Sequence, residues 1–417
     1  MARAAARGGA VALVTAVRER EGARGARAAG RGLVRLCTEL GATFIKVGQI
    51  ASTRADLLPP ALVAELATLQ DRVPPFPFAD VRLTVERELG RPLEEIFDAF
   101  EPRPVAAASV AQVHRAVLRS AGETVAVKVR RPDILDKVRL DRSILLFLAR
   151  NLERVFPTLR LVALETAMRT FCDAIEQQID LRNELANNLR FARDFAEDPD
   201  ISFPRVFPEA CSTSVLTMEF VEGVPESELD AHDLDVDLIV RSGLRGVCRM
   251  IFRNGFVHAD LHPGNLRFVP PGRIVALDLG LVGAIDEHDR LTTARMLFAL
   301  STGDGPTVAR IFHQESPSPT TRDYAAYERE MCAFVDSVRV KGLAHLQVSA
   351  EIGRIFDILR RHHVQARAHM TMVNLAIMTA EGLSKRLAPD VVLAEEVLPY
   401  LAEALGVAVP RLPEGAA

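Results

Sequence analysis

Tryptophan is absent from this sequence, and aromatic residues make up only 6% of its 417 residues. A folded core must therefore consist mainly of aliphatic side chains, which are plentiful because hydrophobic residues reach 48%. The five cysteines lie far apart and form no Cys-x-x-Cys pair, which argues against a disulfide framework and against a zinc site. This sparse use of cysteine favours a reducing compartment, so we expect a cytoplasmic protein.

Long apolar runs and an excess of positive charge are missing as well. No uninterrupted apolar run is long enough to span a bilayer, so we expect no transmembrane helix. The formal net charge is −4, which argues against a nucleic-acid partner. Residues 1–35 nevertheless hold eight arginines against two glutamates. This segment has two interpretations: a solvated basic helix, or a helix that makes peripheral contact with an anionic membrane surface.

The pattern of apolar residues changes along the chain and predicts an α+β fold. β-Branched residues at Val110–Leu118, Thr124–Val129 and Ser214–Val221 predict strands, whereas residues 133–156 and 161–196 have helical periodicity. A small β-rich N-lobe before a larger helical C-lobe is the bilobal arrangement of protein kinases. We therefore predict four segments: a basic segment (1–32), a helical extension (33–92), an N-lobe (93–221) and a helical C-lobe (222–417).

Two motifs in the C-terminal half have the pattern used for phosphoryl transfer. The string His258–Asn265 matches His-x-Asp-x4-Asn, in which Asp260 lies near the reacting group and Asn265 binds a metal. Asp278 opens Asp-Leu-Gly directly after an apolar strand, where a kinase places the carboxylate that holds Mg²⁺ on ATP. Hard cations prefer oxygen ligands, so we predict that Asn265 and Asp278 bind magnesium. The alternative is that both aspartates only form turns or helix caps.

A lysine in a predicted strand extends this pattern upstream. Lys128 lies in Val125–Val129, where its ammonium would neutralise the α- and β-phosphates. Glu184 is its predicted partner on a helix, and Asp180 lies four residues earlier on the same predicted helical face. The alternative is a solvated edge lysine and an ordinary acidic helix face.

Protein kinases cover the phosphates with a glycine-rich loop, and here four residues without glycine take its place: Ala106, Ala107, Ala108 and Ser109. Alanine restricts positive φ and close backbone approach, so we expect a stiffer loop that still offers N–H groups to nucleotide. Met218 and Phe220 belong to the predicted interlobe hinge, whose backbone would bond a purine.

Together these motifs resemble the UbiB/ADCK family of atypical kinases, and the likeness is strengthened by Lys46-x-Gly48-Gln49. The resemblance covers residues from about 33 to 290. It implies that N-terminal helices cover the active site with Lys46 and Gln49 toward the nucleotide. It also implies ATP binding, ATPase activity and support of ubiquinone or other isoprenoid-quinone metabolism. One departure is Gln178, where the family usually has the first acid of Glu-x-Asp, so a neutral hydrogen bond would replace a charge-assisted one.

The segment after Asp278 is short for a kinase activation loop, contains no Ala-Pro-Glu, and follows an Ala259 that replaces the usual arginine. These features count against a protein substrate. Three hypotheses remain. The chain is an ATP-dependent atypical kinase or ATPase, with a lipid or isoprenoid-quinone precursor as partner; a phosphotransferase of the aminoglycoside or choline kinase type; or a non-catalytic nucleotide-binding module.

Overall fold

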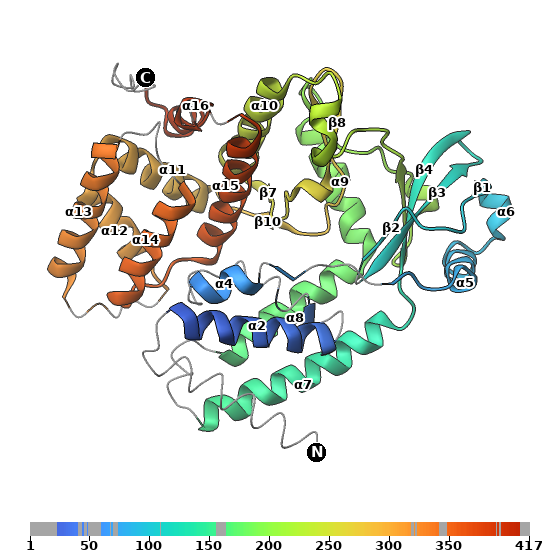
Figure 1. Ribbon diagram of the computed structural model, residues 1–417, viewed down its shortest axis with the longest axis horizontal. Coiled ribbons are helices and arrows are strands. Elements are labelled where there is room, and N and C mark those ends of the chain that lie inside the picture. The colour runs from blue at the N-terminus through green and yellow to red at the C-terminus, as the bar shows by residue number, and fades with distance from the viewer. Residues whose placement is uncertain are drawn as a thin grey trace. The chain divides into compact units, whose positions relative to one another are not determined.

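The computed structural model describes residues 23–40, 44–45, 48, 60–66, 68–69, 74–108, 110–155, 164–317, 321, 323–341, 348–388, 390–391 and 393–408. They form two compact units, whose helices and strands are labelled in Figure 1. The first unit comprises the described residues of Met1–Leu185 and Phe207–Glu219. The second comprises those of Ala186–Val206 and Phe220–Ala417.

The first unit is built on a five-stranded antiparallel sheet. Its strands are β1 (Phe97–Phe100), β2 (Ala106–Ala107), β3 (Ala111–Leu118), β4 (Glu123–Arg130) and β6 (Val215–Glu219). The order is β1–β3–β4–β6, and β2 also pairs with β3. The register places Lys128 of β4 opposite Val113 of β3 on one side and opposite Leu216 of β6 on the other. Lys128 therefore lies on an inner strand, with both neighbours fixed.

One face of this sheet is covered by the helices α5 (Phe78–Leu89) and α6 (Leu93–Ile96). Side chains alternate across a strand, so Val125, Val127 and Val129 of β4 share the buried face. They pack with Val81 and Val85 of α5 in one apolar cluster. A short 3₁₀ turn, η2 (Pro208–Ala210), precedes β6.

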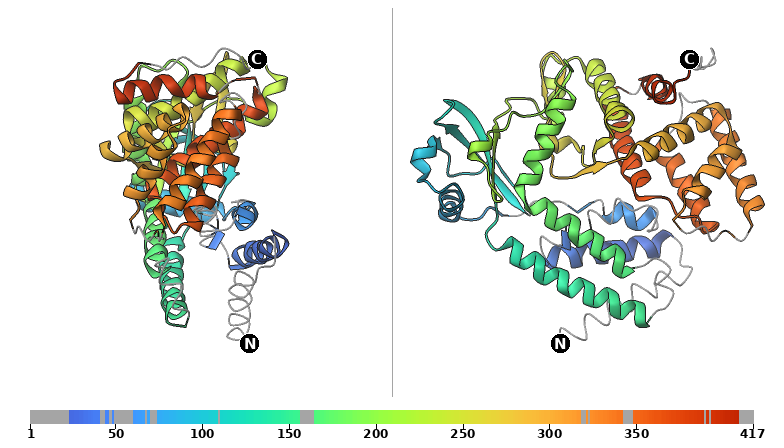
Figure 2. Two further views of the ribbon diagram at one scale, coloured as in Figure 1. Left: turned by 90° about the vertical axis from the view of Figure 1, so that its left-hand side faces the viewer. Right: turned by 180° about the vertical axis from the view of Figure 1, so that it is seen from behind.

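Two helix pairs complete the first unit. The helices α2 (Ala23–Leu40) and α4 (Pro60–Leu66) pack through an aliphatic cluster that includes Cys37 and Leu66. Gly48 is buried beside it, and a Cβ there would collide with Leu69. The helices α7 (Ile134–Val155) and α8 (Leu164–Ile179) lie side by side, as Figures 1 and 2 show, and pack through Val138 and Ile175. The helix α9 (Leu181–Asp194) passes from the first unit into the second.

The second unit holds two small sheets. In one, β5 (Ile201–Ser202) runs parallel to β9 (Arg273–Ala276), which pairs antiparallel with β8 (Leu266–Val269). In the other, β7 (Phe256–His258) pairs antiparallel with β10 (Val282–Ala284), and Val282 lies opposite His258. Short helical turns lie among these strands: η3 (Glu226–Ala231), η4 (Arg249–Asn254) and η5 (Pro263–Asn265).

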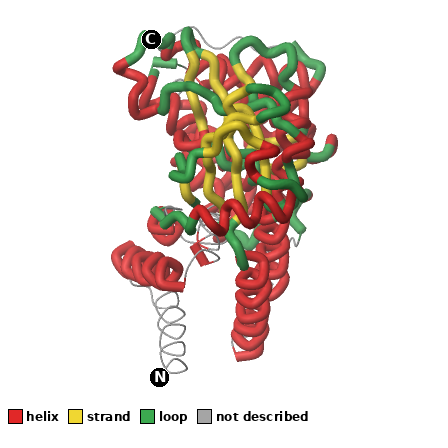
Figure 3. The backbone as a smooth tube through the Cα atoms, turned by 90° about the vertical axis from the view of Figure 1, so that its right-hand side faces the viewer, coloured by secondary structure: helices red, strands yellow, loops and turns green. Residues whose placement is uncertain are grey.

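Helices, red in Figure 3, make up most of the second unit. They are α10 (Val236–Cys248), α11 (Glu287–Thr302), α12 (Gly305–Gln314), α13 (Tyr324–Lys341), α14 (Val348–Arg361), α15 (Ala368–Leu387) and α16 (Leu393–Leu405). Asp235, Asp286 and Asp304 cap α10, α11 and α12, each accepting a backbone N–H of the first turn. Among the described residues, none of the helices combines the length and apolar character needed to cross a bilayer.

The antiparallel sheet and the helical remainder confirm the predicted α+β fold class. Two local predictions need correction. The strand expected to reach Val221 ends at Glu219. The stretch 161–196, expected to be continuously helical, contains two helices that are separated at Asp180. Apolar periodicity continues through this break, so the pattern alone does not show it. The division into four segments stays a prediction.

All five cysteines carry free thiols. Three of them are buried, and Cys211 is half-buried. Desolvation raises the pKa of Cys37 and Cys211 to about 11 and that of Cys248 to about 12. These thiols stay protonated at neutral pH, and protonated thiols are poor nucleophiles.

Candidate functional site

The first unit brings Lys128 and Glu184 together, as their pairing was predicted from the sequence. The Lys128 Nζ donates to both carboxylate oxygens of Glu184, at 2.8 and 2.7 Å. The Lys128 side chain is 14% exposed and that of Glu184 only 4%. A charge so far removed from water is costly unless it is paired, so each group holds the other in position. The result is a fixed ammonium of the kind that binds phosphate.

Asp180 lies at the junction of α8 and α9, so the expectation that it shares a helical face with Glu184 is wrong. Its carboxylate accepts the backbone N–H of Arg182 at 3.0 Å, and the Arg182 guanidinium approaches it to 2.6 Å. The side-chain hydrogen bond from Arg182 is the main cause that lowers the pKa of Asp180. Asp180 thus fixes the start of the helix that carries Glu184. Its role toward a cofactor stays a prediction.

The alanine-rich segment is part of the sheet. Ala106 lies opposite Val113 and Ala107 opposite Gln112, and the Ala108 N–H donates to the Ala111 carbonyl at 2.8 Å. Extended backbone of this kind needs no positive φ, and the described part of the segment has none. This explains why alanine serves where a kinase loop uses glycine.

Gln112 and His114 form a buried polar network behind this segment that the sequence did not predict. The Gln112 side chain accepts the Phe76 N–H at 2.9 Å, and its amide nitrogen donates to the Phe76 carbonyl at 3.3 Å. The same nitrogen lies 2.8 Å from His114 Nε2, which must therefore accept, while Nδ1 donates to the Glu101 carbonyl at 2.8 Å. Burial lowers the pKa of His114, in keeping with this neutral ring.

Arg131 links the alanine-rich segment to the backbone near Phe76. Its Nε donates to the Ala108 carbonyl at 2.9 Å and its Nη2 to the Pro74 carbonyl at 2.8 Å. Its guanidinium also lies over the Phe76 ring, 5.4 Å from the centroid. Arg131 and Gln112 therefore join the segment that enters the sheet, residues 74–77, to the alanine-rich segment. We define this set of contacts as the loop anchor.

The structure describes only some of the other residues that the sequence predicts to bind nucleotide in this half of the chain. Lys46, Gln49 and Ser109 lie outside the described residues. Met218 is buried in β6 opposite Ala126. Phe220 follows β6, and the boundary between the two units falls immediately before it. Their roles in binding a purine stay predictions.

The second unit places the string His258–Asn265, the predicted catalytic string, at the end of β7. His258 is fully buried, and its Nδ1 accepts the Asp260 N–H at 3.0 Å, which fixes the turn that presents Asp260. Burial is the main cause that lowers the pKa of His258. The Asp260 side chain is 42% exposed, and one of its oxygens lies 4.0 Å from His262 Nε2. A buried neutral imidazole thus supports a carboxylate that solvent and ligands can reach.

Asn265 is bonded to this string and to the residue that precedes Asp278. The Asn265 Nδ2 donates to the Asp260 carbonyl at 3.0 Å, and the Leu277 N–H donates to the Asn265 carbonyl at 2.8 Å. Asp278 accepts the Gly280 N–H at 3.0 Å. The amide nitrogen of Asn265 is used in the hydrogen bond to the Asp260 carbonyl, so the amide oxygen is the atom suited to bind a cation. A carboxylate oxygen has lone pairs beyond one accepted bond. This oxygen-rich donor set fits Mg²⁺.

A second group with metal-ligand chemistry lies elsewhere in this unit, at His288, Asp289 and Glu315. Arg367 Nη1 already contacts Asp289 at 2.7 Å and Glu315 at 2.9 Å. The guanidinium supplies the positive charge that a cation would bring, so ion pairing explains this cluster.

Comparison with known proteins adds the family. Residues 68–312 match the ABC1 atypical kinase-like domain, and residues 331–392 match the UbiB helical domain. The protein named probable protein kinase UbiB from Pectobacterium carotovorum is 31% identical over 371 residues, which are 87% of this chain and 68% of that protein. Its namesake from Cronobacter sakazakii is 31% identical over 372 residues, with the same shares.

A solved structure supports the fold. Rv3197 from Mycobacterium tuberculosis, determined in complex with erythromycin, matches with a TM-score of 0.56 at 22% identity. The match covers 76% of this chain and 84% of that one. Together with the domain match, it confirms the kinase-like character of the predicted fold.

The loop anchor can be tested by hydrogen exchange. Arg131→Gln removes the hydrogen bonds to Ala108 and Pro74, so we expect the amides of Phe76 and residues 105–108 to exchange roughly 5–30-fold faster, which corresponds to about 1–2 kcal/mol of local stability. The matched control is Arg119→Gln, which removes an exposed ion pair with Asp98 just after β3. Equal exchange in the two variants would contradict the anchoring role.

The neutral state of His114 predicts a pH dependence of stability. Its pKa in the folded protein lies below the ordinary value of 6.5, so below about pH 6.5 the unfolded chain binds more protons. The free energy of unfolding that neutral His114 contributes at pH 7.5 is therefore lost as the pH falls below about 6.5. His114→Gln cannot titrate, and its Tm should fall less than that of the wild type between pH 7.5 and 5.5. His258 is present in both proteins and cancels in the difference. Parallel Tm profiles would refute the assignment.

Proposed function

The chain belongs to the UbiB family of ABC1 atypical kinase-like proteins, and we propose on that basis that it binds Mg-ATP and acts as an atypical kinase or ATPase. We propose further that this activity supports quinone or other isoprenoid-lipid metabolism. The observation that carries the proposal is the buried Lys128–Glu184 ion pair, which fixes an ammonium in the strand where a kinase binds phosphates.

Residues of the first unit would bind the phosphates. Glu184 orients the Lys128 ammonium toward the α- and β-phosphates and keeps it charged. The loop anchor holds Ala106–Ala108 extended. Backbone N–H groups of this segment that the sheet does not use, together with that of Ser109, would bind nucleotide oxygens. Lys46 and Gln49 would add polar contacts from the N-terminal extension.

Residues of the second unit would hold the metal and the reacting group. Asn265 and Asp278 supply oxygen ligands to Mg²⁺, which would neutralise the phosphate charge. Asp260 would accept the proton of the attacking hydroxyl or water. His258 keeps the Asp260 backbone in place through its Nδ1, which works only while the imidazole is neutral.

The connection after Asp278 favours a small acceptor. β10, which begins at Val282, is paired with β7, and α11 begins at Glu287. The segment between Asp278 and α11 is therefore short and partly paired in a sheet, and it forms no long loop on which a peptide could dock. We propose a lipid headgroup, a small molecule or water as the acceptor of the phosphoryl group.

The metal role is tested with Asp278→Asn, which keeps the side-chain shape and removes the charge. We expect Mg-dependent ATP turnover to fall at least about 100-fold. Asp286→Asn is the matched control, because Asp286 caps α11 by accepting the Asp289 N–H at 2.7 Å and asparagine caps equally well. Wild-type protein that binds Mg-ATP without turnover would favour the non-catalytic module.

The same assay separates the acceptors. Turnover is measured alone, with anionic liposomes, with a quinone-precursor mimic, and with aminoglycosides or choline. Stimulation by liposomes or by the mimic supports the lipid proposal. Phosphate transfer to an aminoglycoside or to choline would replace it with the small-molecule phosphotransferase.

The Lys128 role requires a variant that avoids an unpaired buried charge. Lys128→Met alone leaves the Glu184 carboxylate without its ammonium, which costs about 3–5 kcal/mol. The double variant Lys128→Met/Glu184→Gln removes both charges, so we expect it to fold and to bind Mg-ATP at least about tenfold more weakly by calorimetry. Wild-type affinity in a double variant of normal Tm would contradict the role of Lys128.

A further inference from the structure

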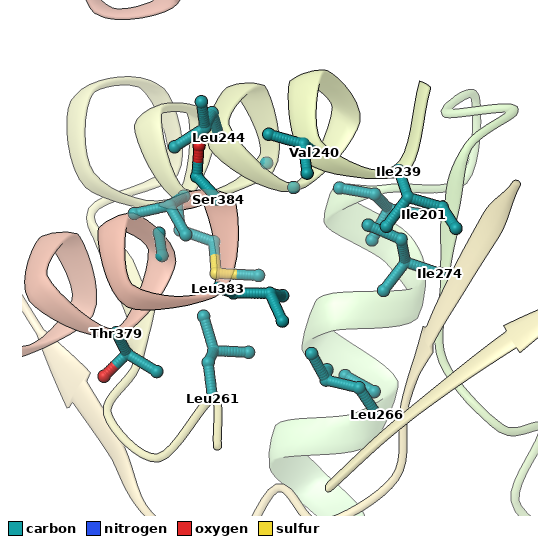
Figure 4. Close-up of a pocket in the computed structure, with 16 residues that line it drawn as sticks. Ile201, Ile239, Val240, Leu244, Leu261, Leu266, Ile274, Thr379, Leu383 and Ser384 are labelled. Atoms are coloured by element: carbon teal, nitrogen blue, oxygen red, sulfur yellow. The ribbon is translucent and has the colours of Figure 1, made fainter. Parts of the chain in front are cut away.

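The spaces inside the two units differ in their chemistry. In the second unit, the space between α10 and α15 has an almost wholly hydrocarbon wall, as Figure 4 shows, and measures only about 50 Å³, counted as space open to the centres of water molecules. In the first unit, a space of about 210 Å³ by the same measure has three arginines in its wall. A water molecule needs about 10–15 Å³, so this larger space accepts a tetrahedral anion with room to spare. We define it as the arginine pocket.

The arginine pocket lies where β4 ends and α7 begins. Arg130 is the last residue of β4 and Arg131 follows it, while Arg87 comes from α5, which packs against the same sheet. Arg87 is exposed, so solvent and solutes reach the pocket from this side. The rest of the wall consists of two buried polar residues and the segment that leads into α7: Thr84, Ser214 and residues 132–136.

Arg130 is a half-buried cation that no carboxylate neutralises directly. Its Nη1 donates to the carbonyls of Ile179 and Thr213, at 3.2 Å each, while its Nε and Nη2 donate to no group among the described residues. Burial is the main cause that lowers the pKa of Arg130, and Glu88 and Asp180 attract it only from beyond ion-pair distance. A guanidinium has five N–H donors, so Arg130 keeps donors for an anion.

The charges in the wall favour an anion over a cation. Two aspartates, Asp133 and Asp136, also line the pocket, and both residues are exposed. Three guanidinium groups against two carboxylates leave one net positive charge. The first turn of α7 adds to it, because the N–H groups of Ile134, Leu135 and Asp136 have no acceptor among the described residues. Such N–H groups carry partial positive charge.

Arg130 also connects the pocket to the helix that carries Glu184. Ile179, whose carbonyl it binds, is the last residue of α8. The Thr213 carbonyl accepts both the Arg130 guanidinium and, at 3.1 Å, the N–H of Leu181, the first residue of α9. An anion on the remaining nitrogens of Arg130 would therefore hold its guanidinium against the two carbonyls at which α8 ends and α9 begins.

We propose that the arginine pocket binds a phosphate monoester, and that the bound phosphate stabilises the start of α9 through Arg130. A phosphate monoester presents several oxygens in a tetrahedron, which match guanidinium groups on one side and backbone N–H groups on another. The exposed rim leaves the rest of the ligand in solvent, so a small phosphorylated compound and the headgroup of phosphatidic acid offer the same group. The site goes beyond the proposed activity, since binding here needs neither nucleotide nor metal.

Inorganic phosphate is the probe, titrated into the full chain without nucleotide. Amide NMR should show saturable shifts at Leu135 and Asp136, whose N–H groups face no other acceptor. Hydrogen exchange of the Leu181 amide should become slower at saturating phosphate, because its acceptor is held by Arg130. Chloride at equal ionic strength should produce neither change, since it has a single charge and no tetrahedral oxygens.

Two variants change the charge of the pocket in opposite directions. Arg87→Gln removes an exposed cation and should raise the phosphate Kd roughly three- to tenfold. It is preferred to a change at Arg130, whose bonds to two carbonyls also support the fold. Asp136→Asn removes a carboxylate and should lower the Kd about two- to fivefold. The matched control is Arg82→Gln, the same change on α5 outside the pocket, which should bind phosphate as the wild type does.

Sedimentation with vesicles identifies the source of the phosphate group. The vesicles are phosphatidylcholine with and without phosphatidic acid. Sedimentation with phosphatidic acid that is lost in Arg87→Gln and kept in Arg82→Gln supports the pocket as a lipid headgroup site. Equal sedimentation of the two variants, together with the phosphate shifts, supports a free phosphorylated compound as the ligand.

Three results would overturn the proposal. Shifts that are absent, or that are confined to the strand around Lys128, would show that the arginine pocket does not bind phosphate. Equal phosphate affinity of the wild type and Arg87→Gln would place the ion elsewhere. Unchanged exchange of Leu181 at saturating phosphate would remove the link to α9. All three are read without nucleotide, so they are independent of any failure of Mg-ATP binding.

Discussion

An ammonium and a carboxylate, both nearly withdrawn from water, hold β4 against α9 through Lys128 and Glu184. Neither charge is tolerable there alone, so the position of each is set by the other. Lys128 is further fixed by pairing on both sides of its strand, and the start of α9 is fixed by Asp180 and Arg182. Three residues beyond Glu184, Asn187 of the same helix donates to the Leu279 carbonyl, beside Asp278. Glu184 and Asn187 are both residues of α9, so this helix makes one such contact within each of the two units.

The loop anchor shows a different solution from that of a glycine-rich phosphate loop. A glycine-rich loop lets the backbone approach the phosphates closely, but such a loop is less rigid. Here the alanine-rich segment is an extended strand, and its rigidity comes from Gln112, His114 and Arg131. Each of these side chains binds backbone groups, so the anchor depends little on the side chains of the segment that it holds.

The sequence predicted the features that follow from local pattern. β-Branched runs located β3, β4 and β6, and motif spacing paired Lys128 with Glu184, which are in contact. The roles of Asp260, Asn265 and Asp278 stay predictions. It missed the break at Asp180, because apolar periodicity continues across it. It missed the loop anchor, because a polar residue in a strand normally faces solvent. Distant residues cover Gln112 and His114: Phe76 bonds Gln112, and the rings of Phe78 and Phe100 pack on His114.

The buried thiols have a practical consequence. With the pKa of Cys37, Cys211 and Cys248 raised to about 11 or 12, almost no thiolate is present near neutral pH. The pKa values of Cys172 and Cys332 are raised as well. A maleimide dye should therefore react slowly with Cys37, Cys211 and Cys248, and quickly with a single cysteine engineered on the surface. Pairs of such labels would allow the distance between the two units to be followed in solution once the half-buried Cys332 is replaced.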